Sequence, residues 1–139
     1  MKTVLTIDDS RVVRTTVARA LAPWGCQILE ARNGLEGLAV ARRSQPDLIV
    51  LDVLMPVLDG RQTLAELRRD PACSGIPVIM LTAVTGEHLV EECSHLGIAG
   101  FLVKPFTMAS FDEVVGRVLG PAGALALASR TLPAALAAH

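Results

Sequence analysis

The chain has 139 residues, the size of one domain, because domains typically contain about 100–150 residues. Its 13 Lys and Arg residues nearly balance 14 Asp and Glu residues, so the net charge gives no general attraction for nucleic acid or for an anionic membrane surface. Hydrophobic residues make up 51% of the chain and aromatic residues only 3%, which predicts an aliphatic core and argues against a base-stacking surface.

Cysteine use and the N-terminal segment indicate where the protein works. The three cysteines, Cys26, Cys73 and Cys93, form no Cys-x-x-Cys pair and no even set, which is typical of a reducing compartment. In the opening segment MKTVLTIDD, two aspartates directly follow a short apolar run, so the segment lacks the pattern of a signal peptide. No run approaches the roughly 20 apolar residues of a membrane span. We expect a cytoplasmic protein that does not contact a membrane.

Short runs rich in Val, Ile and Leu recur along the chain, and each ends in polar residues. Four runs are strong, and a weaker one lies between the first two. Continuous apolarity predicts strands that are buried on both faces, as in a parallel sheet. In chain order the runs are Val4–Ile7, Cys26–Leu29, Leu48–Leu51, Val78–Leu81 and Phe101–Val103.

Apolar residues at helical spacing fill the gaps between these runs. The first set begins after Ser10, a predicted N-cap, and the second follows the pair Asn33-Gly34. The third begins after Asp59, its predicted N-cap, and the fourth after Gly86. Each gap is long enough for the helix that a parallel crossover needs. Five strand–helix units in series predict an α/β fold with a doubly wound, five-stranded parallel sheet and right-handed crossovers.

The last 20 residues differ in composition from the rest. Gly120-Pro121 is expected to end the last helix, and eight alanines and four leucines follow. We therefore expect one domain over residues 1–119. Residues 120–139 form either a loosely ordered tail or a short accessory helix, and they are too few for a DNA-binding output domain.

Chemically active residues stand where the predicted strands end. Asp8 and Asp9 follow the first strand, Asp52 the third, Thr82 the fourth and Lys104 the fifth. Ligands of an open parallel sheet bind beyond the carboxyl ends of its strands, so we expect these groups to converge. Clustered carboxylates repel one another, and Mg²⁺, which prefers oxygen ligands, together with the lysine would relieve that repulsion.

Four motifs occur in a fixed order along the chain: DDSR from residue 8, LDVLMP followed after three residues by glycine, LTA from residue 81, and FLVKPF from residue 101. In this order they resemble the receiver domain of two-component response regulators, over about residues 1–119. The resemblance implies a flavodoxin-like (βα)₅ fold with strand order 2-1-3-4-5; a chemotaxis receiver is one known example of that order.

The resemblance also implies a role for each strand-end residue. Asp52 would be the phosphoacceptor that becomes 4-aspartylphosphate. Asp8 and Asp9, with Asp52 and the backbone carbonyl of Leu54, would hold Mg²⁺.

Two further residues, Thr82 and Lys104, would contact the phosphoryl oxygens, and Phe101 would be the switch aromatic. The bond between Lys104 and Pro105 is usually cis in this family.

By this resemblance the chain is a single-domain response regulator of a phosphorelay rather than an enzyme. A histidine kinase or a histidine phosphotransfer protein would phosphorylate Asp52. The surface of the fourth helix, fifth strand and fifth helix would then bind a downstream protein or a second copy of the chain, with no direct contact with nucleic acid. Leu54 and Val84, both apolar and two residues beyond Asp52 and Thr82, predict slow self-dephosphorylation.

Two other classes of phosphate-handling protein lack their required motifs in this chain. A haloacid-dehalogenase-type phosphatase needs a second aspartate two positions after its nucleophile, where this chain has Leu54. The phosphate loop of P-loop enzymes, GxxxxGK[ST], is absent. Two alternatives stay open: a receiver that acts as a binding module without phosphorylation, and a receiver cut from a larger regulator or hybrid kinase.

Overall fold

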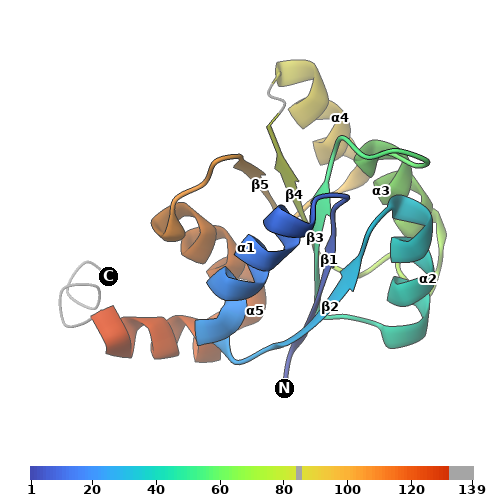
Figure 1. The fold of residues 1–139 in the computed structure, drawn as a ribbon. Coiled ribbons are helices and arrows are strands. Elements are labelled where there is room, and N and C mark those ends of the chain that lie inside the picture. Colours follow the sequence, from blue (N-terminus) through green and yellow to red (C-terminus); the bar gives the residue numbers. More distant parts are fainter. Residues whose placement is uncertain (84–85, 132–139) are drawn as a thin grey trace.

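A parallel sheet of five strands in the order β2-β1-β3-β4-β5 forms the centre of the protein (Figure 1). The computed structural model describes residues 1–83 and 86–131. Both the doubly wound sheet and the strand order agree with the sequence analysis. The strands are β1 (Thr3–Ile7), β2 (Gln27–Ala31), β3 (Leu48–Asp52), β4 (Val78–Thr82) and β5 (Gly100–Val103).

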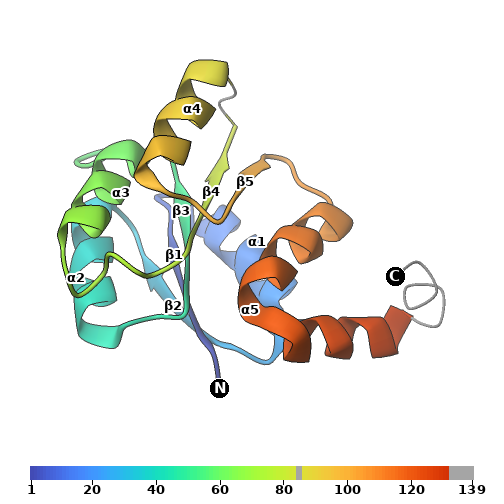
Figure 2. The ribbon, with the colours of Figure 1, turned by 180° about the vertical axis from the view of Figure 1, so that it is seen from behind.

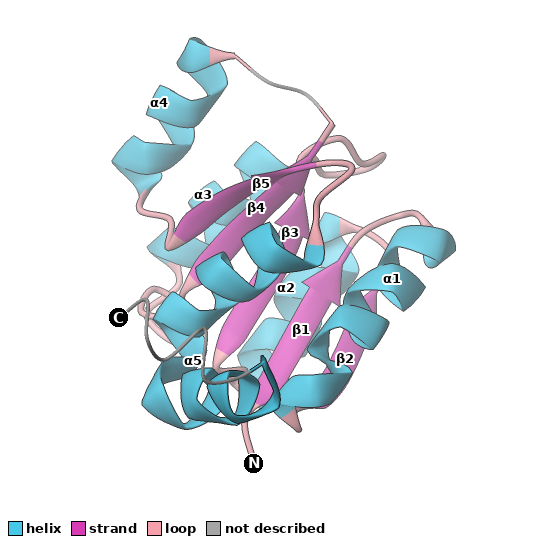
Figure 3. Cartoon of the chain, turned by 90° about the vertical axis from the view of Figure 1, so that its left-hand side faces the viewer, coloured by secondary structure: helices cyan, strands magenta, loops and turns pink. Residues whose placement is uncertain are grey.

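Helices cover both faces of this sheet (Figure 3). One face carries the first and last helices, and the opposite face carries the other three (Figure 2). A short 3₁₀ turn, Ala22–Trp24, follows the first helix. The helices are α1 (Arg11–Leu21), α2 (Gly34–Ser44), α3 (Gly60–Arg69), α4 (Glu87–Leu96) and α5 (Met108–Thr131).

Successive side chains of a strand point to opposite faces of the sheet, and this divides the core into two clusters. In β1, Val4 packs with residues of α1 and α5, whereas the next residue, Leu5, packs with residues of α2 and α3. All five residues of both β3 and β4 are buried. These two strands are therefore buried on both faces, as their apolar runs predict, and the core is mainly aliphatic, as the composition predicts.

Side-chain caps start the first three helices, and the caps at Ser10 and Asp59 are the predicted ones. The hydroxyl of Ser10 accepts a hydrogen bond from the backbone N–H of Val13 at 3.2 Å. Asn33 caps α2 in the same way. Asp59 forms a reciprocal capping box with Gln62, in which each side chain accepts from the other residue's backbone N–H.

The edge strand β2 was predicted less well than the other strands. The apolar run suggested Cys26–Leu29, whereas the strand spans Gln27–Ala31. It lies at the edge of the sheet, and its register pairs Glu30 with Thr6 of β1. Backbone pairing with β1 therefore extends the strand through a charged residue that a search for apolar runs leaves out.

The C-terminal helix α5 is broken at Gly120, whose φ of 82° and ψ of −171° are not helical. The helix resumes and continues to Thr131, and this second part leads away from the sheet (Figure 1). The final part of the predicted tail, residues 132–139, lies outside the described residues, as does Val84. Within the described part of the chain, no helix is long and apolar enough to cross a membrane.

Candidate functional site

Lys104 joins the ends of two strands through a pair of ionic hydrogen bonds. Its ammonium nitrogen Nζ lies 3.2 Å from Asp8 Oδ2 and 3.2 Å from Asp52 Oδ1. Asp8 directly follows β1, Asp52 is the last residue of β3, and Lys104 directly follows β5. The predicted convergence at the carboxyl edge of the sheet is therefore present for these three side chains.

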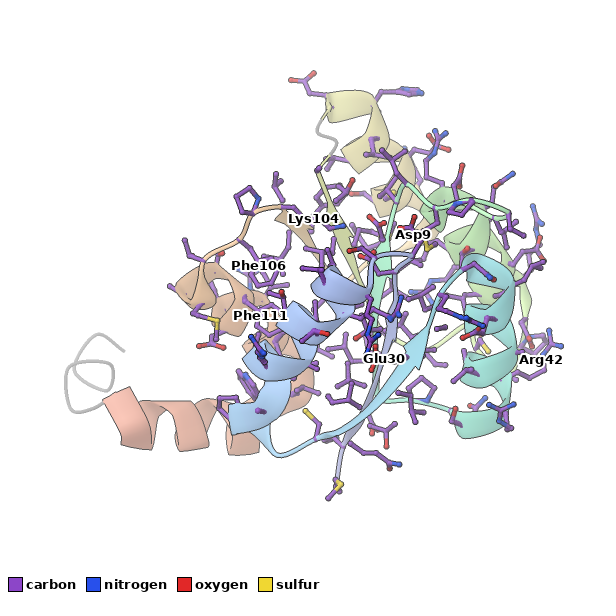
Figure 4. The ribbon with its side chains drawn as sticks, in the orientation of Figure 1. Asp9, Glu30, Arg42, Lys104, Phe106 and Phe111 are labelled. Carbon is purple, nitrogen blue, oxygen red and sulfur yellow. The ribbon has the colours of Figure 1, made fainter. Side chains whose placement is uncertain are left out.

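Asp9 completes a cluster of three carboxylates. Asp8, Asp9 and Asp52 each offer an oxygen, and the three oxygens lie within 4.8 Å of one another. Asp8 and Asp52 are buried, with 1% and 4% of their surfaces exposed, whereas Asp9 is exposed. Figure 4 shows Asp9 and Lys104 at the same end of the sheet. Such a set of hard oxygen donors, open on one side for water, fits a cation such as Mg²⁺.

The electrostatics of the cluster are unfavourable without a further cation. Burial raises the pKa of Asp52, and the neighbouring carboxylate of Asp8, with a smaller effect of Asp9, raises it further. The charge and hydrogen bond of Lys104 act in the opposite direction but do not cancel the increase. One ammonium group therefore compensates the buried carboxylates only in part.

Arg14 binds the backbone at the end of β1, next to the carboxylate cluster, a role that the sequence analysis did not find. Its nitrogen Nη1 donates to the backbone carbonyl oxygen of Asp8 at 2.7 Å, and its Nε donates to Glu30 Oε1 at 2.8 Å. The Arg14 side chain is only 10% exposed. The spacing along α1 could have revealed this role, because Arg14 lies three residues before Val17 and seven before Leu21, and both are buried. An arginine on the buried face of a helix needs a partner.

Gly60 allows α3 to begin directly against the end of β3. A Cβ atom at this position would lie 2.2 Å from the carbonyl oxygen of Asp52 and 2.7 Å from the Cα of Val53. The backbone N–H of Gly60 also donates to the carbonyl oxygen of Val53 at 2.7 Å. The glycine in the LDVLMP motif is thus explained by close backbone approach, and it fixes the loop that follows Asp52.

Of the other predicted site residues, Thr82 and Leu54 lie at or just beyond strand ends at this edge of the sheet, whereas Phe101 does not. Thr82 is fully buried at the end of β4, and its carbonyl oxygen accepts from the backbone N–H of Lys104 at 2.9 Å. Leu54 is 60% exposed two residues beyond Asp52. Phe101 does not lie among the charged groups: it is half-buried and packs against the hydrophobic cluster that includes α4 residues. The Lys104–Pro105 bond is cis, as the resemblance implied.

This fold, with an acidic cluster and a lysine at the carboxyl edge of the sheet, defines a known class of α/β proteins. Residues 4–116 match the family model described as the response regulator receiver domain. The chain belongs to this receiver family. Receiver domains are signalling domains rather than typical enzymes, and they interact with histidine kinases or phosphotransfer proteins and with downstream targets.

Single-domain proteins are among the similar sequences. The chain is 35% identical over 115 residues to the protein PilG of Pseudomonas aeruginosa, which covers 83% of each chain. It is 33% identical over 119 residues to PilH of the same organism, covering 86% of this chain and 98% of PilH. By contrast, it spans about half the length of the transcriptional regulators that it matches, for example 50% of PhoB from P. aeruginosa.

Solved structures give the same result. The chemotaxis response regulator CheY4 of Vibrio cholerae superposes with a TM-score of 0.79 at 34% identity, covering 85% of this chain and 98% of CheY4. The receiver domain of the sensor histidine kinase PA1611 from P. aeruginosa superposes with a TM-score of 0.77 at 28% identity, covering 86% and 98% of the two chains. That receiver holds a magnesium ion in its active site cleft.

The raised pKa of Asp52 predicts that its ionised form destabilises the folded protein. The folded-state pKa lies above the ordinary value of 3.8, so this cost is present at neutral pH and disappears once the pH falls low enough to protonate Asp52 in both states. We expect Asp52→Asn, measured in a metal chelator, to melt at a higher temperature than the wild type at pH 7. The difference should shrink as the pH falls through the folded-state pKa towards 3.8.

Asp70 provides a control of opposite sign. A backbone N–H bond from Ala72 and a side-chain bond from Arg42 lower the pKa of Asp70. Asp70→Asn should therefore melt below the wild type at pH 7 and approach it at low pH, as followed by circular dichroism over the same pH series. If Asp52→Asn instead melted below the wild type at pH 7, the interaction of Asp52 with Lys104 would stabilise the fold more than the burial of Asp52 and its repulsion by Asp8 destabilise it. That result would contradict the prediction.

Proposed function

We propose that this chain is a cytoplasmic response regulator in which Asp52 accepts a phosphoryl group from a phosphohistidine. The observation that carries the proposal is the placement of Asp52 at the carboxyl edge of the sheet, with Lys104 at 3.2 Å and two further carboxylates beside it. A carboxylate is a known phosphoryl acceptor. Phosphoryl transfer depends mainly on positioning and charge neutralisation, and this pocket is suited to both.

Mg²⁺ is the cofactor that the oxygen cluster would hold. Asp8, Asp9, Asp52 and the backbone carbonyl of Leu54 are the proposed ligands. When bound, the metal would neutralise negative charge on the pocket and on the incoming phosphoryl group. The magnesium ion in the PA1611 receiver supports this assignment by analogy.

The protein's own groups have separate tasks in the transfer. An oxygen of Asp52 forms a bond to phosphorus while the bond from phosphorus to the donor imidazole nitrogen breaks, and the nitrogen keeps the electron pair. Lys104 already contacts Asp52, so its ammonium can turn to a phosphoryl oxygen without crossing the pocket. The hydroxyl of Thr82, at the neighbouring strand end, would donate to another phosphoryl oxygen.

Movement of Thr82 would couple the pocket to the surface formed by α4, β5 and α5. Phe101 lies opposite Met80 in the β4–β5 register, and it packs against the cluster that includes Leu89 and Leu96 of α4. A change in its rotamer would thus alter the packing of α4. We propose that this surface binds a downstream protein or a second copy of the chain.

Two alternatives differ in what the domain is used for. The similarity to receivers that form half of a transcriptional regulator, or part of a sensor histidine kinase, favours a receiver of a larger protein as the second candidate. A receiver that binds its partner without phosphorylation would have no need for the charge arrangement around Asp52, and we consider it the weaker candidate.

Intact mass after incubation with acetyl phosphate and Mg²⁺ tests the proposal. We expect the wild-type protein to gain one phosphoryl group, because the small donor needs no docking surface. Asp52→Asn should gain none, since an amide oxygen is a poor nucleophile, and omission of Mg²⁺ should prevent the gain. Folding of both proteins is checked by circular dichroism. A wild-type protein that stays unmodified would favour the binding-module alternative, and phosphorylation of Asp52→Asn would contradict the assignment of the acceptor.

Leu54 predicts a long-lived phosphorylated state. Its apolar side chain stands exposed beyond Asp52 and offers no hydrogen bond to a hydrolytic water. We expect Leu54→Asn to lose the phosphoryl group several-fold faster than the wild type, because the amide can orient that water. Decay is followed by mass after removal of the donor. Val90→Asn, at an exposed valine of α4, is the control. An unchanged or slower decay in Leu54→Asn would contradict this role.

A further inference from the structure

Asp8 forms a hydrogen bond at each of its polar atoms. Its backbone N–H donates to the carbonyl oxygen of Ala31 at 3.1 Å, and its own carbonyl oxygen accepts from Arg14 Nη1 at 2.7 Å. In the side chain, Oδ1 accepts from the backbone N–H of Ser10 at 2.9 Å, and Oδ2 accepts from Lys104 Nζ at 3.2 Å. Bonds to both the backbone and the side chain therefore fix the position of this buried carboxylate.

The edge strand β2 holds Asp8 twice, once directly and once through Arg14. Ala31, the last residue of β2, accepts the backbone N–H of Asp8. Glu30, the residue before it, accepts from Arg14 Nε at 2.8 Å, while Nη1 of the same guanidinium binds the Asp8 carbonyl. In Figure 4, Glu30 lies farther from the carboxyl edge of the sheet than Asp9 does. The strand thus supports the metal-binding cluster from outside it.

Arginine is the side chain that can make both bonds at once. Its guanidinium presents several N–H donors in a rigid, planar fork, so one group can reach the Glu30 carboxylate and the Asp8 carbonyl together. The Arg14 side chain is 10% exposed and that of Glu30 is 49% exposed. Because the two charges of this pair balance each other, Arg14 adds a hydrogen bond beside the acidic cluster without adding a free positive charge.

The position of Asp8 matters because of the metal that the cluster fits. Mg²⁺ demands near-ideal octahedral geometry, so a misplaced oxygen ligand binds it poorly. Residues that hold a metal ligand in place from outside the coordination shell typically affect the metal affinity by about 10–100-fold. Arg14 and Glu30 have this relation to Asp8.

We propose that Arg14 and Glu30 form a positioning pair that sets the affinity of the acidic cluster for Mg²⁺. Glu30 orients the guanidinium of Arg14, and Arg14 holds the backbone of Asp8 so that its carboxylate stays beside those of Asp9 and Asp52. Neither residue of the pair contacts the metal or the phosphoryl group. This inference rests on the proposed function.

Two variants separate the effect of position from that of charge. Arg14→Met removes the bond to Asp8 and leaves an unpaired negative charge on Glu30. The double variant Arg14→Met/Glu30→Gln removes the same bond but keeps the net charge of the chain. A pair that acted only through charge would give tighter Mg²⁺ binding in the first variant and wild-type binding in the second. Because the pair acts through position, we expect the Kd for Mg²⁺, measured by calorimetry, to rise about tenfold in the double variant and to rise also in Arg14→Met.

A second ion pair provides the matched control. Arg42 Nε lies 2.8 Å from Asp70 Oδ2, as close as Arg14 Nε lies to Glu30, and Figure 4 shows Arg42 on α2, away from Asp9. Arg42→Met/Asp70→Asn makes the same kind of change and should leave the Kd for Mg²⁺ unchanged.

Arg14→Lys is a milder test of the same bond, and circular dichroism checks the folding of every variant. Lysine keeps the charge, but its single nitrogen cannot replace both donors of the guanidinium. We expect its Kd for Mg²⁺ to rise several-fold. This variant decides the question if the double variant does not fold.

The results distinguish this inference from the function on which it rests. A wild-type protein that acetyl phosphate does not label would contradict the proposed function, and one that binds no Mg²⁺ would contradict the proposed metal site. If the wild type is labelled and binds Mg²⁺, an unchanged Kd in the folded double variant or in Arg14→Lys would overturn the positioning pair alone. Tighter binding in Arg14→Met would show that the pair acts through charge, and it would overturn the inference as well.

Discussion

The bridge that Lys104 makes between Asp8 and Asp52 is the interaction on which the remaining structure of the site depends. Two buried carboxylates and a third beside them are tolerated because an ammonium group lies between the ends of β1 and β3. That group comes from the end of β5, so three strands must end in register for the cluster to exist. The raised pKa of Asp52 indicates that compensation is incomplete, and an incompletely compensated acidic pocket attracts cations.

The backbone around the pocket is more constrained than its open side. Arg14, which also donates to Glu30, donates to the carbonyl oxygen of Asp8, and Gly60 allows α3 to begin against the carbonyl of Asp52. The β3–α3 loop lies between these fixed points, and within it Val57 adopts a positive φ of 73°. Rigid positioning of the acceptor is therefore produced by these contacts. In the proposed function, this rigid positioning serves the phosphoryl transfer.

The sequence predicted the features that can be recognised from a short segment of the chain alone. Short runs of Val, Ile and Leu marked the strands because parallel strands are buried on both faces, and Asp8, Asp52 and Lys104 were found because each stands at a strand end. The pair Arg14–Glu30 was missed because its partners come from different elements and meet only in the fold. The positive φ of Val57 could not be predicted at all, since valine disfavours it. The edge strand β2 was misplaced because backbone pairing, not apolarity, sets its end.

Calorimetric titration of Mg²⁺ into the wild type and into Lys104→Met tests the central claim that Lys104 compensates the carboxylates of the phosphoryl-acceptor site only in part and leaves them able to bind a metal. The account predicts a single Mg²⁺ site in both proteins. Lys104→Met should bind Mg²⁺ more tightly, because its carboxylates no longer pair with an ammonium group. The same variant should react much more slowly with acetyl phosphate, since a phosphoryl oxygen loses its cationic partner. Weaker Mg²⁺ binding in Lys104→Met, or undiminished phosphorylation, would contradict the account.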